Sequence, residues 1–143
     1  MWNVIVEPAA ETDLDNLWAS GDAEKRAAVS LIEVSLEEVA HDDGFLDRMY
    51  RRHETLVATA TIDADRLVAF WNDRTEPRNL SRLKLWHVPE EGGRLCPYRI
   101  VYAVDARSDS YHILGIVHRN TDYDRNHPLI ARILRDYDDL GIP

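Results

Sequence analysis

Two apolar segments in the second half of the chain constrain its fold more than any other feature. Residues 98–105 read YRIVYAVD and residues 111–117 read YHILGIV, and the five residues between them form a polar turn. Strand-length segments of this kind, separated by a short turn, predict an antiparallel β-hairpin. A strand is also predicted just upstream, where Leu83 and Leu85 alternate with Arg82 and Lys84.

The first forty residues predict a strand followed by two helices. Residues 2–6 are β-rich and the strand pattern stops at Pro8. Apolar side chains then recur at helical spacing over residues 9–19 and again over residues 23–40. Between them, Gly21 suits a helix C-terminus and Asp22 a helix N-cap, so the two helices are expected to form a hairpin. A C-terminal helix is predicted from Pro128 up to Gly141.

Residues 42–79 are expected to form a helical insertion. Their pattern predicts helices over 45–54 and 64–71, whereas residues 56–62 fit either a helix or a strand. The segment is too apolar for a disordered linker, so we expect it to be ordered and packed on the domain's edge. The whole chain, residues 1–143, is then one α+β domain: an antiparallel sheet with the N-terminal helical hairpin packed on one face.

Composition and charge limit the binding partners and the cellular compartment that we expect for the protein. The chain has 17 Lys and Arg, 26 Asp and Glu and a net charge of −9, which on its face argues against a nucleic-acid binder. The charge is uneven, because residues 1–73 hold 6 basic and 16 acidic side chains and residues 74–132 hold 10 basic and 7 acidic ones. A single cysteine, no basic leader and no apolar run of membrane length together predict a cytoplasmic protein without membrane contacts.

Common catalytic motifs are absent from the sequence. The six histidines show neither HExxH spacing nor a cluster with the cysteine, and no GxSxG or glycine-rich phosphate loop is present. We therefore expect no metal and no cofactor.

Basic residues along the predicted strands are the best candidates for a site. The alternation places Arg82 and Lys84 on one face, and Arg99 on the face opposite Ile100 and Tyr102. His118, Arg119 and Tyr123 follow the last strand. The six side chains are expected to converge on one open, concave face of the sheet, with the N-terminal helices on the other face. RNA cleavage by a 2′-hydroxyl needs cations around the phosphate, a base and an acid. Taken singly, each of these residues is better explained as a solvated, packed or ion-paired side chain than as an active one. The candidate catalytic residues are Arg99, Arg119, Tyr123, Lys84, Arg82 and His118.

Four stretches together resemble the RelE/ParE superfamily of bacterial toxins of type II toxin–antitoxin systems. They are WNVIVEPAAETDLDNL at the start, the basic strand around Lys84, PYRIVYAVD, and YHILGIVHRNTDY, which closes on His-Arg and a later Tyr. The match covers roughly residues 1–41 and 80–125. This chain differs from typical members in its length, its net charge of −9 and the insertion at about 42–79.

The resemblance implies a RelE-like, ribosome-dependent mRNA endoribonuclease that needs no metal. It implies strand cations at Arg82 and Lys84, a transition-state arginine at Arg99, a strand-end arginine at Arg119 beside His118, and a stacking tyrosine at Tyr123. The partners it implies are a cognate antitoxin protein, the ribosome and mRNA. Two alternatives stay open: a ParE-like poison of DNA gyrase, and a non-catalytic protein-binding module of the same fold. The sequence does not decide whether the protein forms a homo-oligomer.

Overall fold

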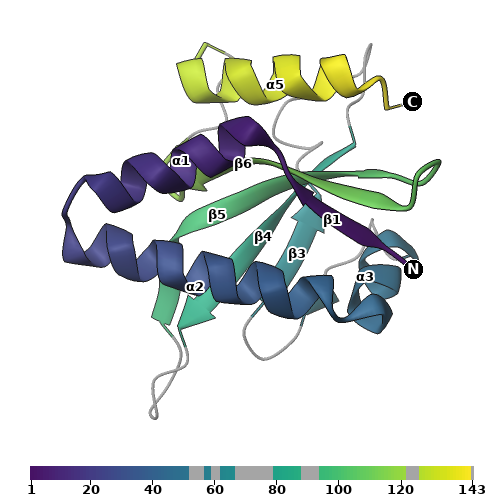
Figure 1. The fold of residues 1–143 in the computed structure, drawn as a ribbon, viewed down its shortest axis with the longest axis horizontal. Coiled ribbons are helices and arrows are strands. Elements are labelled where there is room, and N and C mark those ends of the chain that lie inside the picture. The colour runs from purple at the N-terminus through teal and green to yellow at the C-terminus, as the bar shows by residue number, and fades with distance from the viewer. Residues whose placement is uncertain (52–56, 59–61, 67–78, 88–93, 122–125, 143) are drawn as a thin grey trace.

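The computed structural model describes residues 1–51, 57–58, 62–66, 79–87, 94–121 and 126–142. Within these residues the chain forms one six-stranded sheet with helices on both faces (Figure 1). In chain order the elements are β1 (Asn3–Val6), α1 (Pro8–Ala19), α2 (Ala23–Ala40), α3 (Asp43–Arg51), β2 (Val57–Ala58), β3 (Ile62–Arg66), β4 (Leu80–His87), β5 (Arg94–Asp105), β6 (Ser110–His118) and α5 (Pro128–Leu140).

The sheet is mixed rather than antiparallel. Its strand order is β1-β6-β5-β4-β3-β2, and every neighbouring pair is antiparallel except β1 and β6, which run parallel. The predicted hairpin is confirmed, with Arg99 opposite Val117 and Asp105 opposite Ser110. The expectation of a wholly antiparallel sheet is wrong because β1 pairs with the last strand of the chain, and no local sequence signal reports the direction of such a distant pairing.

The helical hairpin covers one face of the sheet, as predicted. The Asp22 side chain accepts a hydrogen bond from the Lys25 N–H and caps α2, and Gly21 takes the left-handed conformation in the turn, with a φ of 74°. Side chains of α1 and α2 join the β4, β5 and β6 residues of this face in the larger core, whose members include Leu14, Ile32, Leu83, Ile100 and Ile116.

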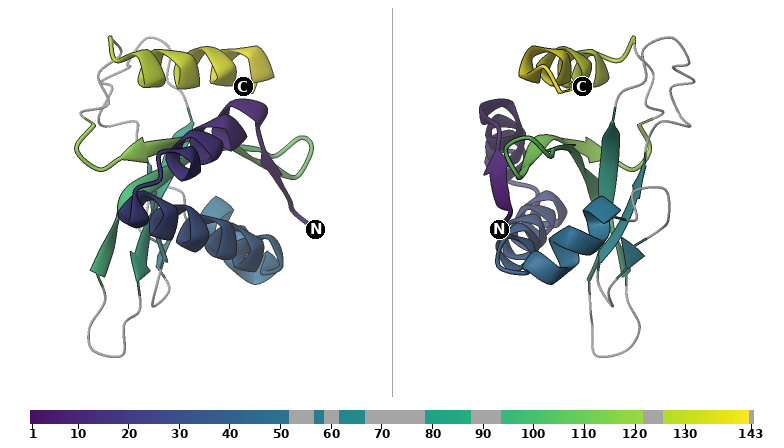
Figure 2. Two further views of the ribbon diagram at one scale, coloured as in Figure 1. Left: turned by 60° about the vertical axis from the view of Figure 1, so that its left-hand side comes forward. Right: turned by 90° about the vertical axis from the view of Figure 1, so that its right-hand side faces the viewer.

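A second core lies on the opposite face, under α5. Val101 and Ala103 of β5 and Val117 of β6 pack there against Ile130 and Ile133 of α5. Figures 1 and 2 show α5 on the β6 side of the molecule, away from α2 and α3. The C-terminal helix is confirmed, but it means that the face opposite the hairpin is partly covered. None of the helices within the described residues has the length and apolar character needed to cross a membrane.

The segment at 42–79 is only partly helical. Its first part is the predicted helix, α3. Two hydrogen bonds hold this helix in place, one of 2.7 Å from Trp2 Nε1 to the Asp47 carboxylate and one from the Tyr111 hydroxyl to the Leu46 carbonyl. Residues 64–66, expected to be helical, instead belong to β3, where Ile62 pairs with Leu85 of β4. Pairing with β4 outweighs the weak helical preference there, and residues 67–71 of the expected helix lie outside the described residues.

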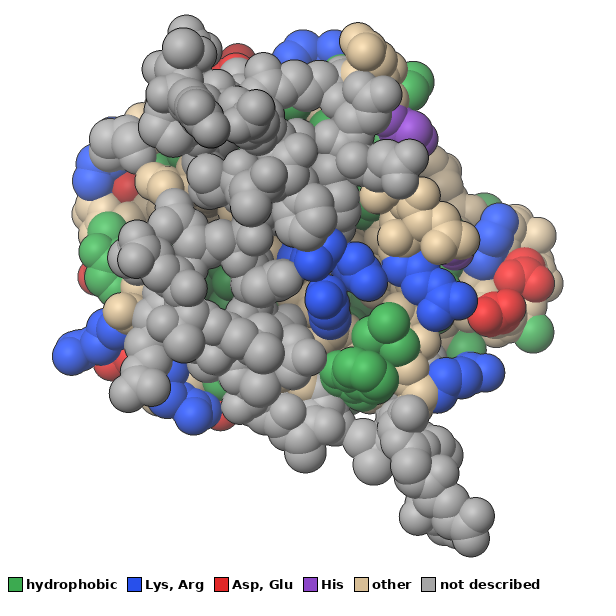
Figure 3. Space-filling view, turned by 180° about the vertical axis from the view of Figure 1, so that it is seen from behind, with side chains coloured by type: hydrophobic (Ala, Val, Ile, Leu, Met, Phe, Trp, Pro, Cys, Tyr) green, Lys and Arg blue, Asp and Glu red, His purple; other side chains and the backbone are tan. Residues whose placement is uncertain are grey.

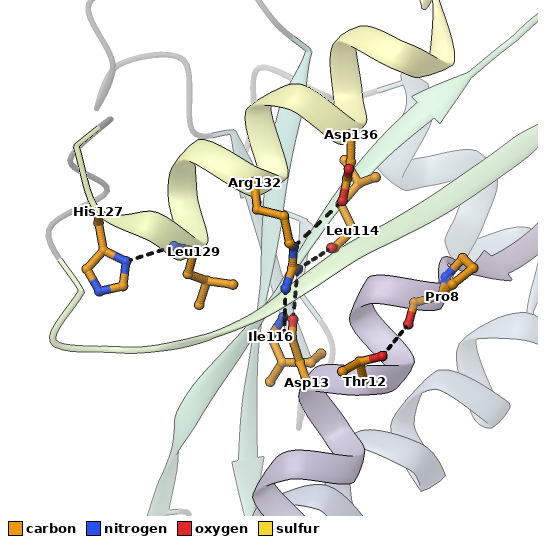
Figure 4. Close-up of polar contacts among 9 residues, drawn as sticks. All are labelled: Pro8, Thr12, Asp13, Leu114, Ile116, His127, Leu129, Arg132 and Asp136. Carbon is orange, nitrogen blue, oxygen red and sulfur yellow. Dashed lines mark hydrogen bonds and ion pairs between the residues drawn. The ribbon is translucent and has the colours of Figure 1, made fainter.

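An ion pair joins α5 to α1 across the edge of β6 (Figure 4). Arg132 donates to both carboxylate oxygens of Asp13, at 2.7 and 2.9 Å, and also to the Leu114 carbonyl at 2.9 Å, while Asp13 accepts from the Ile116 N–H at 3.1 Å. Gly115 permits this close approach, because a Cβ there would lie 2.6 Å from Ile133 Cδ1. The pair fixes how α5 lies across the sheet.

Replacing Asp13 by alanine should therefore lower the free energy of unfolding by about 2–3 kcal/mol, because it leaves the Arg132 guanidinium and the Ile116 N–H without their acceptor. Asp15→Ala is the matched control, since Asp15 is an exposed carboxylate on the same helix. Chemical denaturation of both variants checks this. A difference between them below about 0.5 kcal/mol would contradict the assignment.

Candidate functional site

Lys84 and Arg99 lie directly opposite each other on neighbouring central strands. They are register partners in the pairing of β4 with β5. Leu83 and Leu85 on one strand and Ile100 on the other belong to the core under the helical hairpin. Because side chains alternate along a strand, Lys84 and Arg99 must both project from the opposite face of the sheet.

The backbone pattern brings these two cations close. The Arg119 N–H donates a hydrogen bond of 2.7 Å to the Pro97 carbonyl, so Pro97 and Arg119 form a hydrogen-bonded pair between β5 and β6. Such pairs alternate with non-hydrogen-bonded ones along an antiparallel ladder, so Arg99 and Val117 form the next hydrogen-bonded pair. On its other side Arg99 therefore forms a non-hydrogen-bonded pair with Lys84, the kind whose Cα atoms are typically ~4.5 Å apart. Like charges in this arrangement repel each other and destabilise the sheet.

Arg99 also carries a buried donor that the protein does not use. Its Nε is buried and has no hydrogen-bond partner within the described part of the chain. Its cross-strand neighbours are a lysine and a valine, whereas Lys84 also has Asp63 of β3 opposite it in the register. A buried donor without an acceptor costs free energy. An anion bound between the two cations would supply the missing acceptor once a small shift of the guanidinium exposes the Nε.

A bulge beside the pair shapes this end of the face. Between Lys84 and Trp86, β4 has one residue where β5 has three, Cys96 to Tyr98. The insertion of two residues preserves the alternation, since Cys96 is buried in the hairpin-side core and Tyr98 packs against it. Burial raises the pKa of the Cys96 thiol, so it stays protonated and is poorly suited to act as a nucleophile. Bulges often occur next to functional sites because they redirect side chains.

Arg119 lies at the same end of the sheet as Arg99. Its backbone bond to Pro97 continues the β5–β6 pairing by one residue beyond the last pair, Tyr98 with His118. In this register Arg119 is a diagonal neighbour of Arg99 on the same face, and its side chain is exposed. The structure thus brings together three of the predicted cations: Lys84, Arg99 and Arg119.

Arg82 shares the face but is not a free cation. It is only 6% exposed and already takes part in an interaction within the protein. Its register partners are Asp65 on β3 and Val101 on β5. The expectation that Arg82 points into an open site is wrong, because its side chain is buried and already engaged.

His118 lies on the other face of the sheet. It is the register partner of Tyr98, and the two rings are in an edge-to-face arrangement with centroids 5.1 Å apart. Burial, and then the nearby Asp22 and Glu24 carboxylates, raise the pKa of Tyr98 above its usual range. The expected convergence of His118 with Arg99 is therefore wrong: alternation along β6 turns it toward the N-terminus of α2. Tyr123 falls outside the described residues, and its role stays a prediction.

Trp86 is the residue that sequence reasoning missed. It is half-buried, follows the buried Leu85, and pairs with Leu95, so it belongs to the face that carries Lys84 and Arg99. The strict alternation of residues 82–86 could have placed it there. Figure 3 views this face and shows Lys and Arg side chains gathered in one group beside apolar side chains, with the described carboxylates in view lying at the margins.

We call Lys84, Trp86, Leu95, Pro97, Arg99 and Arg119 the cation face. Among the described residues no group of three or more His, Cys, Asp or Glu side chains could hold a metal ion. No protein family model, curated protein or solved structure matches the chain. The resemblance to the RelE/ParE superfamily stays a prediction.

Arg99→Met tests whether the cation pair is a source of strain in the free protein. Methionine keeps the aliphatic stem but removes both the charge opposite Lys84 and the unpartnered Nε, so we expect the free energy of unfolding to rise by about 1 kcal/mol. The gain should shrink at high salt, which screens the repulsion. Arg135→Met, at an exposed position of α5, is the control. Thermal and urea unfolding measure both variants, and an Arg99→Met protein less stable than wild type would contradict this interpretation.

Proposed function

We propose that this protein is the toxin of a type II toxin–antitoxin pair and acts as a RelE-like, metal-independent mRNA endoribonuclease. The observation that carries the proposal is the juxtaposition of Lys84 and Arg99, with the Arg99 Nε buried and without an acceptor. Two opposed cations with a spare donor form a site prepared for an anion, and a phosphodiester is an anion that arginine binds through two hydrogen bonds.

The chemistry that this site would support is transfer within the RNA strand. The 2′-oxygen of a ribose attacks the adjacent phosphorus and loses its proton, the bond from phosphorus to the 5′-oxygen breaks, and that oxygen takes up a proton. The products are a 2′,3′-cyclic phosphate and a 5′-hydroxyl. Negative charge builds up on the non-bridging oxygens, and Lys84 and Arg99 would bind those oxygens more strongly as it does.

The cation face and the acidic helices point away from each other. The exposed carboxylates Glu33, Glu37 and Glu38 lie on α2, and α2 packs on the hairpin face. Exposed charges more than ~8–10 Å apart are largely screened at physiological salt. The net charge of −9 should therefore slow encounter with the ribosome more than it weakens binding at the site. The antitoxin would be the cellular partner that silences the protein.

Two outcomes would favour other functions. A poison of DNA gyrase would arrest growth through DNA breaks and would not depend on Lys84 or Arg99. A non-catalytic binding module would not arrest growth at all.

Induced expression of Arg99→Ala in bacteria is the direct test. Wild type should arrest growth with cleaved mRNA, and Arg99→Ala should lose cleavage by a hundredfold to a thousandfold, the typical worth of one preorganised donor. Arg119→Ala should weaken cleavage to a smaller degree, because Arg119 is exposed and at the rim. Primer extension on a reporter mRNA measures the cleavage, and melting curves confirm that each variant is folded.

His118→Ala distinguishes the site seen in the structure, which excludes His118, from the site predicted from the sequence, which includes it. Because His118 lies on the hairpin face, this folded variant should keep its toxicity. Full toxicity of Arg99→Ala, or loss of cleavage in His118→Ala with folding intact, would refute the assigned site.

A further inference from the structure

Trp86 sits where a nucleotide held at the cation pair would place its base. Lys84 and Trp86 are two residues apart on β4, so their Cα atoms are spaced by roughly 7 Å along one face of the sheet. A single nucleotide spans a comparable distance between its phosphate and its base. Trp86 is half-buried, and no ring contact is assigned to it within the described residues, so its indole has no aromatic partner of its own there.

The neighbours of Trp86 hold its indole in place and leave part of the ring exposed. Its cross-strand partner is Leu95, and Pro97 follows on the same face. These half-buried apolar side chains support the indole from one side, which reduces the conformational entropy lost when a ligand stacks on it. A partly exposed tryptophan beside two cations is the combination by which proteins hold single-stranded nucleic acid: cations for the backbone and an aromatic ring for a base.

We infer that Trp86 stacks on an unpaired nucleobase of the RNA whose adjacent phosphate lies between Lys84 and Arg99. The inference rests on the proposed function and adds a base subsite to it: the RNA must present at least one unstacked base beside the bound phosphate. Trp86 is a positioning residue. It takes no part in proton transfer, and it fixes the ribose and phosphate in register with the cations. Stacking tolerates all four bases, so it contributes affinity rather than sequence selectivity.

Binding of two oligonucleotides to the whole protein tests the inference. One is a six-nucleotide 2′-O-methyl RNA, which cannot be cleaved because its 2′-oxygens are blocked. The other has the same backbone without bases. Wild type should bind the base-bearing strand about tenfold or more tightly than the abasic one at low salt, as base–aromatic stacking typically contributes. Trp86→Leu should bind both strands equally, whereas Trp86→Phe should keep most of the preference.

Trp18→Phe is the matched control, because Trp18 is 48% exposed on α1 and should leave both affinities unchanged. Arg99→Met should weaken the binding of both strands alike, since it removes a phosphate contact.

If wild type binds the base-bearing strand and cleaves mRNA but folded Trp86→Leu keeps the preference, the role of Trp86 is wrong while the proposed function stands. If wild type neither binds the strand nor cleaves mRNA, both fail. If an oligoglutamate peptide binds the cation face as tightly as RNA and with equal dependence on Trp86, an acidic protein partner replaces RNA.

Discussion

The pairing of β5 with both of its neighbours is the constraint on which the rest of the structure depends. Along this strand Ile100 and Tyr102 face the helical hairpin, while Arg99, Val101 and Ala103 face the other way. Both layers of the domain are therefore defined by a single alternation. A shift of register by one residue would bury Arg99 under the hairpin and expose Ile100, which would cost far more free energy than the repulsion between Arg99 and Lys84.

The two faces of β5 differ in how completely they are covered. The hairpin side is a continuous core that includes fully buried Ile32, Phe45, Leu46 and Tyr111. The other side is divided: α5 covers its β5–β6 part, held by the Arg132–Asp13 pair, and the cation face lies at the end of β4 and β5 beyond that cover. On this face the part under α5 contributes the stability, so the repulsion expected between the two cations can be tolerated beside it. Proteins commonly accept such local strain where a ligand binds.

Local patterns in the sequence were sufficient to predict the helical hairpin, the β5–β6 hairpin, the basic strand and α5. They placed Lys84 and Arg99 on the face opposite the helical hairpin because alternation is a local property. What they missed depends on distant contacts. The direction of β1 follows from its pairing with β6, and the strand at residues 62–66 from its pairing with β4. The burial of Arg82 and the contact of the His118 ring with Tyr98 likewise depend on neighbouring strands.

The Arg99 Nε–H resonance offers the most direct view of the central claim that the cation pair is a phosphate site. This buried proton should be visible in a ¹H–¹⁵N spectrum, and Arg99→Lys identifies its peak by removing it. On titration with the 2′-O-methyl RNA, the peak should move downfield as the Nε–H gains an acceptor, and it should saturate at the same concentration as the overall binding curve. A peak that stays unmoved while the protein binds the RNA would show that the phosphate is held elsewhere.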